Sequence, residues 1–304
     1  MPAATAIIGP PFRFCLYGYA GLALIAAAEA LLFSGNQLVG HWFTPVVWTG
    51  YILSTDALVY KLKGRSLLTT DRLEFLIVVV VSIAGWWLFE FYNAPRFWNS
   101  DLELWWHYHN LEPNLWLRRI GYDWAFATIS PALFETAEIF SLTIFARQTQ
   151  HRAIKLSRSM LLAITGLGAV GVVAPLLFPS GWLAPVVWLS YIMLLDPLNA
   201  LRGWPAISGD LSRGDWRRVL SLLASGALCG FLWEFWNYWS LSKWTYTVPY
   251  FGNLKIFEMP VLGFLGFPPF AIECWALYIF CRSLLTPKPA QVSSPTSIWI
   301  ETNG

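Results

Sequence analysis

The chain has 304 residues, of which 56% are hydrophobic, 17% are aromatic and only 12% are charged, with a net charge of +2. This apolar composition excludes an ordinary soluble globular protein and predicts a protein whose main solvent is lipid. The basic residues form no long run interleaved with aromatic residues, so the sequence gives no indication of nucleic-acid binding. The four cysteines stand in apolar stretches without Cys-x-x-Cys spacing, which favours neither a disulfide framework nor a thiolate metal site.

Eight apolar stretches are long enough to cross a bilayer, because a hydrocarbon core of about 30 Å needs about 20 residues of helix. We predict helices over 13–34, 43–60, 73–94, 122–146, 159–180, 182–200, 217–240 and 259–283. The first is expected to be a retained helix and not a signal peptide, since Glu29 interrupts it and no small-residue cleavage site follows. The predicted fold class is an all-α polytopic membrane protein of about eight transmembrane helices.

The lysines and arginines predict the orientation of these helices, because such residues concentrate in cytoplasmic loops. With both termini inside, 15 of the 20 basic residues fall in cytoplasmic segments. The sequence therefore predicts a multi-pass protein of the inner (plasma) membrane with both termini cytoplasmic. It does not determine the oligomeric state.

The two halves of the chain resemble each other. Segment 42–56, WFTPVVWTGYILSTD, matches segment 182–196, WLAPVVWLSYIMLLD, at eight of fifteen positions. FEFYN at 89–93 pairs with WEFWN at 233–237, and PALFE at 131–135 pairs with PFAIE at 269–273. This similarity predicts a tandem duplication of a four-helix unit, with copies over 1–148 and 149–284 and a disordered cytoplasmic tail over 285–304. Since each unit crosses the membrane an even number of times, we expect the copies to run in the same sense, with a cavity between them.

Acidic residues occur inside the predicted helices, where an ionised carboxylate costs several kcal/mol and therefore indicates a function. The predicted catalytic residues are Glu273, Glu234, Glu135 and Glu90. Glu135 and Glu273 are predicted closest to the middle of the membrane and are the first candidates. The alternative is that such acids only form interhelical hydrogen bonds, and this reading is favoured for Asp56 and Asp196, which lie near basic loops.

A proline stands four residues before each of the two central glutamates. Pro131 precedes Glu135 and Pro269 precedes Glu273, so each carboxyl is expected on the face where proline frees a backbone carbonyl. The spacing predicts a kinked, polar spot in the wall of a pocket.

The other pair of glutamates is followed by amides and surrounded by aromatic residues. Asn93 and Asn237 stand three residues after Glu90 and Glu234, so each asparagine can donate a hydrogen bond to its glutamate. The predicted substrate-binding residues are Asn93, Asn237, Trp87, Trp233, Trp236, Trp244 and Tyr246. Aromatic faces suit an apolar, polyunsaturated or cationic guest, although many of the tryptophans belong to interfacial belts.

The outer loop between the third and fourth predicted helices contains His107 and His109, beside Glu112 and Asp123. A single His-x-His pair without spaced partners does not predict a metal site. An interfacial amphipathic segment is the favoured interpretation of this loop. No pattern in the sequence requires a cofactor.

Segment 244–273, WTYTVPYFGNLKIFEMPVLGFLGFPPFAIE, resembles the end of the small membrane-integral lycopene cyclases of the bacterial two-subunit and archaeal fused type. In that family a Trp-x-Tyr outer segment precedes a Gly and Pro motif with a helical glutamate. Where the family has Pro-x-Glu-Glu, this chain has Pro269 four residues before Glu273. The resemblance implies a redox-neutral cyclisation that begins with protonation of an isoprenoid double bond, with Glu273 or Glu234 as the acid.

Three functions remain open at this point. The first is a membrane-embedded enzyme that acts on a lipophilic isoprenoid by proton transfer from a carboxylic acid. The second is a proton- or cation-coupled transporter in which paired acids of the two halves carry the coupling ion. The third is an accessory or structural membrane subunit. Aromatic crowding around the acids favours the enzyme, whose partners would be a lipophilic small molecule within the bilayer and the membrane lipids.

Overall fold

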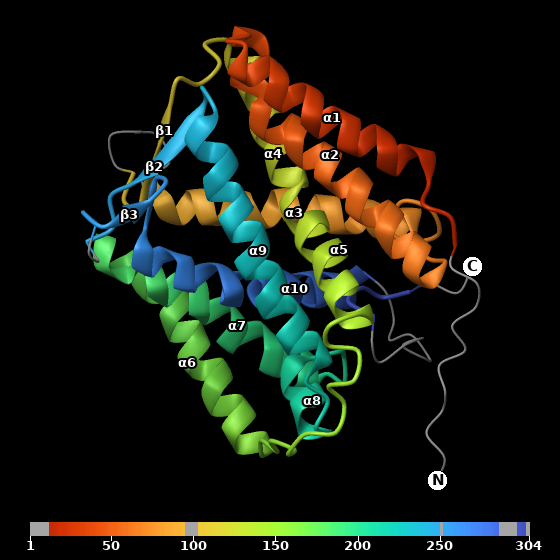
Figure 1. The fold of residues 1–304 in the computed structure, drawn as a ribbon. Coiled ribbons are helices and arrows are strands. Elements are labelled where there is room, and N and C mark those ends of the chain that lie inside the picture. Colours follow the sequence, from red (N-terminus) through yellow and green to blue (C-terminus); the bar gives the residue numbers. More distant parts are fainter. Residues whose placement is uncertain (1–11, 95–102, 250–251, 286–296, 302–304) are drawn as a thin grey trace.

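The computed structural model describes residues 12–94, 103–249, 252–285 and 297–301 of a mainly helical chain (Figure 1). The α-helices are α1 (Leu16–Phe33), α2 (Gln37–Lys63), α3 (Arg72–Asn93), α4 (Leu115–Ala127), α5 (Ile129–Leu142), α6 (Arg158–Leu177), α7 (Ala184–Leu201), α8 (Ile207–Ser212), α9 (Arg217–Trp239) and α10 (Phe267–Leu285). Short 3-10 helices precede α7 and α10, namely η2 (Gly181–Leu183) and η3 (Val261–Gly266). The strands are β1 (Trp106–His109), β2 (Lys243–Tyr246), β3 (Lys255–Ile256) and β4 (Met259–Pro260).

Six helical segments of the described chain are long and apolar enough to cross a membrane: α1, α3, α6, η2 with α7, α9, and η3 with α10. The chain is therefore a multi-pass membrane protein, as its composition predicts. The other two predicted stretches are helical as well, since 43–60 lies within α2 and 122–146 covers parts of α4 and α5. Length and hydropathy thus support six of the eight predicted crossings.

The predicted helix over 122–146 is divided into two helices that meet at Thr128. The Thr128 hydroxyl donates to the carbonyl oxygen of Ala125 at 2.7 Å, which satisfies a carbonyl near the end of α4. Pro131 lies in the first turn of α5, and Pro269 lies in the first turn of α10. In a first turn the missing N–H of proline breaks no intrahelical hydrogen bond. The two prolines therefore begin helices, and the expectation that they kink the interior of a helix is wrong.

Two pairs of consecutive helices pack closely, α1 with α2 and α6 with α7, and they lie on opposite sides of the molecule in Figure 1. Glycines permit this approach. A Cβ atom on Gly21 of α1 would come within 2.5 Å of the carbonyl oxygen of Gly50 in α2. A Cβ atom on Gly168 of α6 would come within 2.4 Å of the backbone nitrogen of Leu194 in α7. Small residues at both crossings are typical of packing between transmembrane helices.

The C-terminal segment 297–301 packs between α2, α5 and α10, and its first four residues are buried. Trp299 is 2% exposed and Ile298 is 1% exposed. The Ile298 carbonyl accepts a hydrogen bond from the Trp275 indole at 2.6 Å, and the Ile300 amide donates to the Tyr278 hydroxyl at 3.0 Å. The prediction of a disordered tail over 285–304 is wrong for this segment, because its apolar side chains and backbone groups find partners inside the bundle; residues 286–296 and 302–304 lie outside the described residues.

Acidic and basic side chains form buried pairs around the same end of the bundle. Lys63 lies 2.6 Å from Glu138 and 2.8 Å from Glu301. Arg218 pairs with Asp210 in α8, and these two side chains are 4% and 3% exposed. These contacts offset the desolvation of the charges and hold α2, α5, α9 and the C-terminal segment together.

Candidate functional site

Two short strands connect the halves of the chain. β1 follows α3 and β2 follows α9, and they pair antiparallel with His107 opposite Thr245 and with Trp106 opposite Tyr246. Since side chains alternate along a strand, Trp106, Tyr108, Trp244 and Tyr246 share one face of the two-stranded sheet. We call these four residues the aromatic roof, because all four line a cavity beneath the sheet.

Histidines and threonines occupy the other face of the sheet. His107 Nε2 is 2.7 Å from the Thr247 hydroxyl, and His109 Nε2 is 2.8 Å from the Thr245 hydroxyl. His107 Nδ1 also lies 3.1 Å from a carboxylate oxygen of Glu103. These contacts stabilise the strand pair, and no cluster of three or more metal-ligating side chains occurs among the described residues.

Asn93 and Asn237 hold the strands to the ends of α3 and α9. The Asn93 carboxamide donates to the Trp106 carbonyl at 2.9 Å and accepts from the Trp106 amide at 3.1 Å. Asn237 does the same with Trp244, at 2.8 Å and 2.9 Å. The expectation that these asparagines donate to their neighbouring glutamates is therefore wrong, because buried backbone groups of the strands take up their hydrogen bonds.

Glu90 is held by three donors that all reach the same oxygen, Oε1. The Tyr108 hydroxyl lies 2.5 Å away, the Trp86 indole nitrogen 2.8 Å away and the Trp106 indole nitrogen 3.3 Å away. Three hydrogen bonds to one carboxylate oxygen favour the charged form of Glu90.

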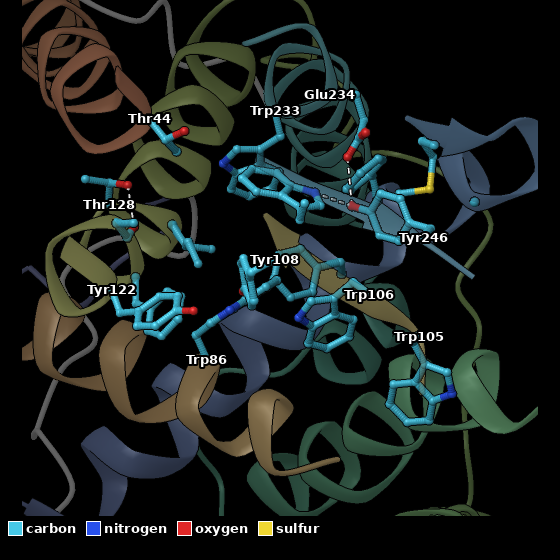
Figure 2. A pocket seen from close by; sticks show the side chains of 18 of the residues that line it. Thr44, Trp86, Trp105, Trp106, Tyr108, Tyr122, Thr128, Trp233, Glu234 and Tyr246 are labelled. Carbon is cyan, nitrogen blue, oxygen red and sulfur yellow. Dashed lines mark hydrogen bonds between the residues drawn. The ribbon is translucent and has the colours of Figure 1, made fainter. Parts of the chain in front are cut away.

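Glu234 has a poorer set of partners. Its Oε1 accepts one hydrogen bond, from the Tyr246 hydroxyl at 2.8 Å, and its buried Oε2 has no partner among the described residues. The Trp244 indole donates in turn to the Tyr246 hydroxyl at 2.7 Å. Figure 2 shows the Tyr246 hydroxyl directed at the Glu234 carboxyl. Glu234 borders the cavity and is 0% exposed, so its carboxyl is desolvated and covered within the wall.

The two roof tyrosines remain hydrogen-bond donors. Burial, and after it the neighbouring Glu90 carboxyl, raises the pKa of Tyr108 well above its usual value. Burial and the Glu234 carboxyl raise the pKa of Tyr246 in the same direction. Both phenols are therefore protonated at neutral pH and can stabilise negative charge on their glutamates.

The cavity has a volume of about 520 Å³. Helices α2, α3, α4, α7, α9 and α10 contribute to its wall, and Figure 2 shows aromatic rings around it. The large aromatic residues of the wall are Trp42, Trp48, Trp86, Trp105, Trp106, Tyr108, Tyr122, Phe126, Trp188, Trp233, Trp244, Tyr246, Phe267 and Phe270. Glu112 and Glu234 are the acids among the described lining residues. A chamber of this size and composition suits an apolar ligand.

Glu135 and Glu273 are buried, at 1% and 0% exposed, but neither lines the cavity. Both oxygens of each carboxyl lack a hydrogen-bond partner among the described residues. The charged neighbours of Glu135 include Asp56, Lys63 and Glu138. The structure thus places Glu90 and Glu234 beside the roof and Glu135 and Glu273 away from it, and of these four sequence-predicted acids Glu234 alone borders the cavity.

The predicted aromatic residues are also divided. Trp233, Trp244 and Tyr246 line the cavity. Trp87 lies elsewhere, since its indole donates to Asp123 at 2.7 Å and its ring packs against Arg119. Trp236 does not line the cavity: its indole donates to Glu29 at 3.0 Å, and its ring packs against Trp48.

Tyr108 is the most informative residue that sequence reasoning missed. WHYH at 106–109 and WTYT at 244–247 stand 138 positions apart, the same offset as Pro131 and Pro269, so a comparison of these two segments could have identified it. Asp56 and Asp196 accept hydrogen bonds from the segments that follow their helices, as their interpretation as structural acids predicts. Asp56 accepts from the Leu68 amide at 2.8 Å, and Asp196 accepts from the Ser208 amide at 3.0 Å.

No protein-family model matches the chain, and no curated protein or solved structure matches it either. The chemistry of the cavity is therefore the basis on which a function can be assigned.

Proposed function

We propose that this protein is a membrane-embedded enzyme that transfers a proton from Glu234 to a carbon–carbon double bond of a lipophilic, isoprenoid-like substrate. The observation that carries the proposal is the buried Glu234 carboxyl, one oxygen of which has no partner among the described residues, beside aromatic side chains in the wall of the cavity. Desolvation favours the neutral form of a carboxylic acid, which is the form that a general acid needs. The resemblance of segment 244–273 to the membrane-integral lycopene cyclases supports the same class of reaction.

The proposed step is redox-neutral. The O–H bond of Glu234 breaks as a C–H bond forms on the alkene, which leaves a carbocation on the substrate. A second double bond of the same molecule attacks that cation and closes a ring. Loss of a proton from the ring to the Glu234 carboxylate then restores the acid. Aromatic faces of the wall, such as those of Trp233 and Trp244, stabilise the cation, and Tyr246 stabilises the carboxylate.

Glu90 is the weaker candidate for the acid, although it occupies the matching position in the first half. Its three donors stabilise the carboxylate and oppose proton storage on it. We assign Glu90 the role of holding Tyr108 and Trp106 in the aromatic roof.

The decisive comparison is between Glu234→Gln and Glu90→Gln. An amide cannot protonate an alkene, so Glu234→Gln should lower turnover by the roughly 10²- to 10⁴-fold that acid catalysis contributes. Glu90→Gln should lower turnover far less, because the amide oxygen still accepts hydrogen bonds. The assay supplies acyclic polyene isoprenoids to membranes containing each variant and measures products of unchanged mass but altered retention.

Thermal unfolding of both variants is the control for folding. Full turnover by Glu234→Gln would show that this carboxyl is not the acid. Absence of any isomerised product from the wild-type protein, across a range of isoprenoids, would remove the enzyme proposal itself.

Proton-coupled transport is the second candidate, and one observation favours it. Glu135 and Glu273 are buried acids without hydrogen-bond partners among the described residues. Neither of them lines the cavity, so neither is placed to protonate a substrate bound there. Acids in such positions are expected of a coupling site. Proton-driven uptake into vesicles that is abolished by Glu135→Gln or Glu273→Gln would favour transport. Absence of both activities from the wild-type protein, together with a lower stability of these variants, would favour an accessory subunit.

We also propose that the chain crosses the membrane eight times as a tandem duplication, with units at 1–148 and 149–284. A helix of 27 residues such as α2 is about 40 Å long, which is enough to cross. The strand pairing supports the duplication. With the offset of 138, Trp106 corresponds to Trp244 and Tyr108 corresponds to Tyr246. In the strand pair Trp106 lies opposite Tyr246 and Tyr108 lies opposite Trp244, so each strand contacts the other through equivalent residues. Such reciprocal pairing is expected where two equivalent units meet at a two-fold axis.

A further inference from the structure

One end of the cavity wall is polar. We call the four residues concerned the polar rim: His41, Glu112, Arg118 and Ser242. They come from α2, from the loop before α4, from α4 and from the residue before β2. The rim therefore joins the two halves of the chain at one edge of the aromatic chamber.

The rim retains hydrogen-bonding capacity that the described part of the chain does not use. Arg118 donates through Nε to the Glu112 carbonyl at 2.7 Å, and its two terminal nitrogens make no hydrogen bond to described residues. His41 uses only Nδ1, which lies 3.0 Å from the Asn110 carbonyl and 3.1 Å from the Ser242 hydroxyl. Its Nε2 has no partner among the described residues. A ligand in the cavity can therefore receive hydrogen bonds from the Arg118 guanidinium.

The rim and the proposed acid lie at opposite ends of the aromatic roof. Ser242 and Tyr246 belong to the same extended segment and are four residues apart, a separation of about 13 Å at the rise of a β-strand. Tyr246 contacts Glu234, whereas Ser242 contacts His41. A ligand that engages both ends must be elongated, with its polar group remote from the bond that Glu234 protonates.

The charges of the polar rim limit which polar group a ligand can place there. Arg118 offers donors, and the Glu112 side chain offers carboxylate oxygens, one of which accepts the Asn114 amide at 3.1 Å. A hydroxyl matches this pair because it both accepts and donates. A phosphate also accepts from Arg118, but its negative charge is repelled by Glu112. A pure hydrocarbon leaves the terminal nitrogens of Arg118 without a ligand partner.

Helix α4 provides a route from the bilayer. Its outward residues are apolar, with Trp116 82% exposed and Leu115 72% exposed, while Arg118 of the same helix lines the cavity. An amphipathic segment such as these first turns of α4 suits the membrane interface, where the hydroxyl of an amphiphile resides.

We propose that the cavity binds an isoprenoid alcohol, with its hydroxyl between Arg118 and Glu112 and its hydrocarbon chain along the aromatic roof towards Glu234. This assignment rests on the proposed function, which it refines by naming the substrate class. The hydrocarbon end of the alcohol enters the cavity first. Its distal double bonds pass beneath the aromatic roof, and its hydroxyl stays at the polar rim.

The test is a binding titration, read as quenching of the intrinsic tryptophan fluorescence of the purified protein in lipid nanodiscs. The probes are geranylgeraniol, geranylgeranyl diphosphate and an acyclic hydrocarbon of the same carbon number. Geranylgeraniol should bind most tightly. Arg118→Gln should weaken its binding by about 10-fold or more, the usual effect of losing a hydrogen bond to a charged group, and should leave hydrocarbon binding unchanged.

Arg119→Gln is the matched control. Arg119 neighbours Arg118 but pairs with Asp123 and Trp87 outside the cavity, so this variant should bind all probes as the wild type does. Equal binding of alcohol and hydrocarbon, with no effect of Arg118→Gln, would overturn the alcohol assignment and leave the proposed enzyme standing. Preference for the diphosphate would overturn it in favour of an anionic head group. Failure of all three probes to bind would overturn both proposals.

Discussion

Glu138 is the residue through which the C-terminal segment is most directly attached to the bundle. Its Oε1 lies 2.6 Å from the Lys63 ammonium, and its Oε2 accepts the Ile298 amide at 2.7 Å. The Glu138 side chain is 2% exposed and that of Lys63 is 15% exposed. We therefore expect Glu138→Ala to destabilise the folded protein strongly.

The expected magnitude follows from the groups left behind. Removing one partner of a buried ion pair costs about 3–5 kcal/mol. Within that figure, an unsatisfied buried N–H such as that of Ile298 accounts for about 1–3 kcal/mol. Lys63 keeps Glu301 at 2.8 Å, which places the expected loss at the lower end, about 3 kcal/mol. Glu138→Gln keeps an acceptor for one of the two donors and should cost about half as much.

The assay is unfolding of the purified protein by added denaturing detergent, followed by tryptophan fluorescence. A chain truncated after residue 296 completes a double-mutant cycle with Glu138→Ala. The truncation also removes Glu301, the second partner of Lys63, so the cycle is measured in chains that carry Lys63→Met. In that background Glu138→Ala should cost at least about 1 kcal/mol less in the truncated chain, which has no Ile298 amide to satisfy, than in the full chain.

The control is Glu258→Gln, which removes a half-buried ion pair with Lys243 and should cost less than about 1 kcal/mol. Equal costs of Glu138→Ala in the full and truncated chains would refute the docking of the C-terminal segment onto Glu138.

Two further substitutions test the packing and the roof. Gly21→Val should abolish the close crossing of α1 and α2, because its Cβ would lie 2.5 Å from the Gly50 carbonyl oxygen, and the yield of folded protein should fall sharply. Gly166→Ala is the control: no atom lies within 4 Å of its Cβ, so the folded yield should not change. Asn237→Ala should lower the free energy of unfolding by about 2–4 kcal/mol, since it leaves the amide and carbonyl of Trp244 without partners, and an unchanged unfolding midpoint would contradict the anchoring role.

The sequence by itself determined that the protein lies in a membrane and where along the chain its helices occur. Apolar runs of about 20 residues are local features of the sequence. The free energy of exposing such a run to water does not depend on the rest of the fold. The eight predicted stretches are therefore all helical, even where the exact ends differ. Intramembrane acids such as Glu234 and Glu273 were identifiable for the same reason, since an acidic residue within an apolar run is visible in that segment of the sequence alone.

Only the tertiary structure decided what each acid contacts. Glu90 and Glu234 bond to tyrosines of the strands, while Glu273 receives no hydrogen bond from the described residues, a difference that spacing along one helix cannot reveal. Docking of the C-terminal segment is a still more distant effect, because Trp299 reaches Asp71 across 228 positions. Hydropathy describes the environment of a residue, but the partner of a buried polar group is set by which distant backbone and side-chain atoms the packed helices bring within 3 Å or so of it.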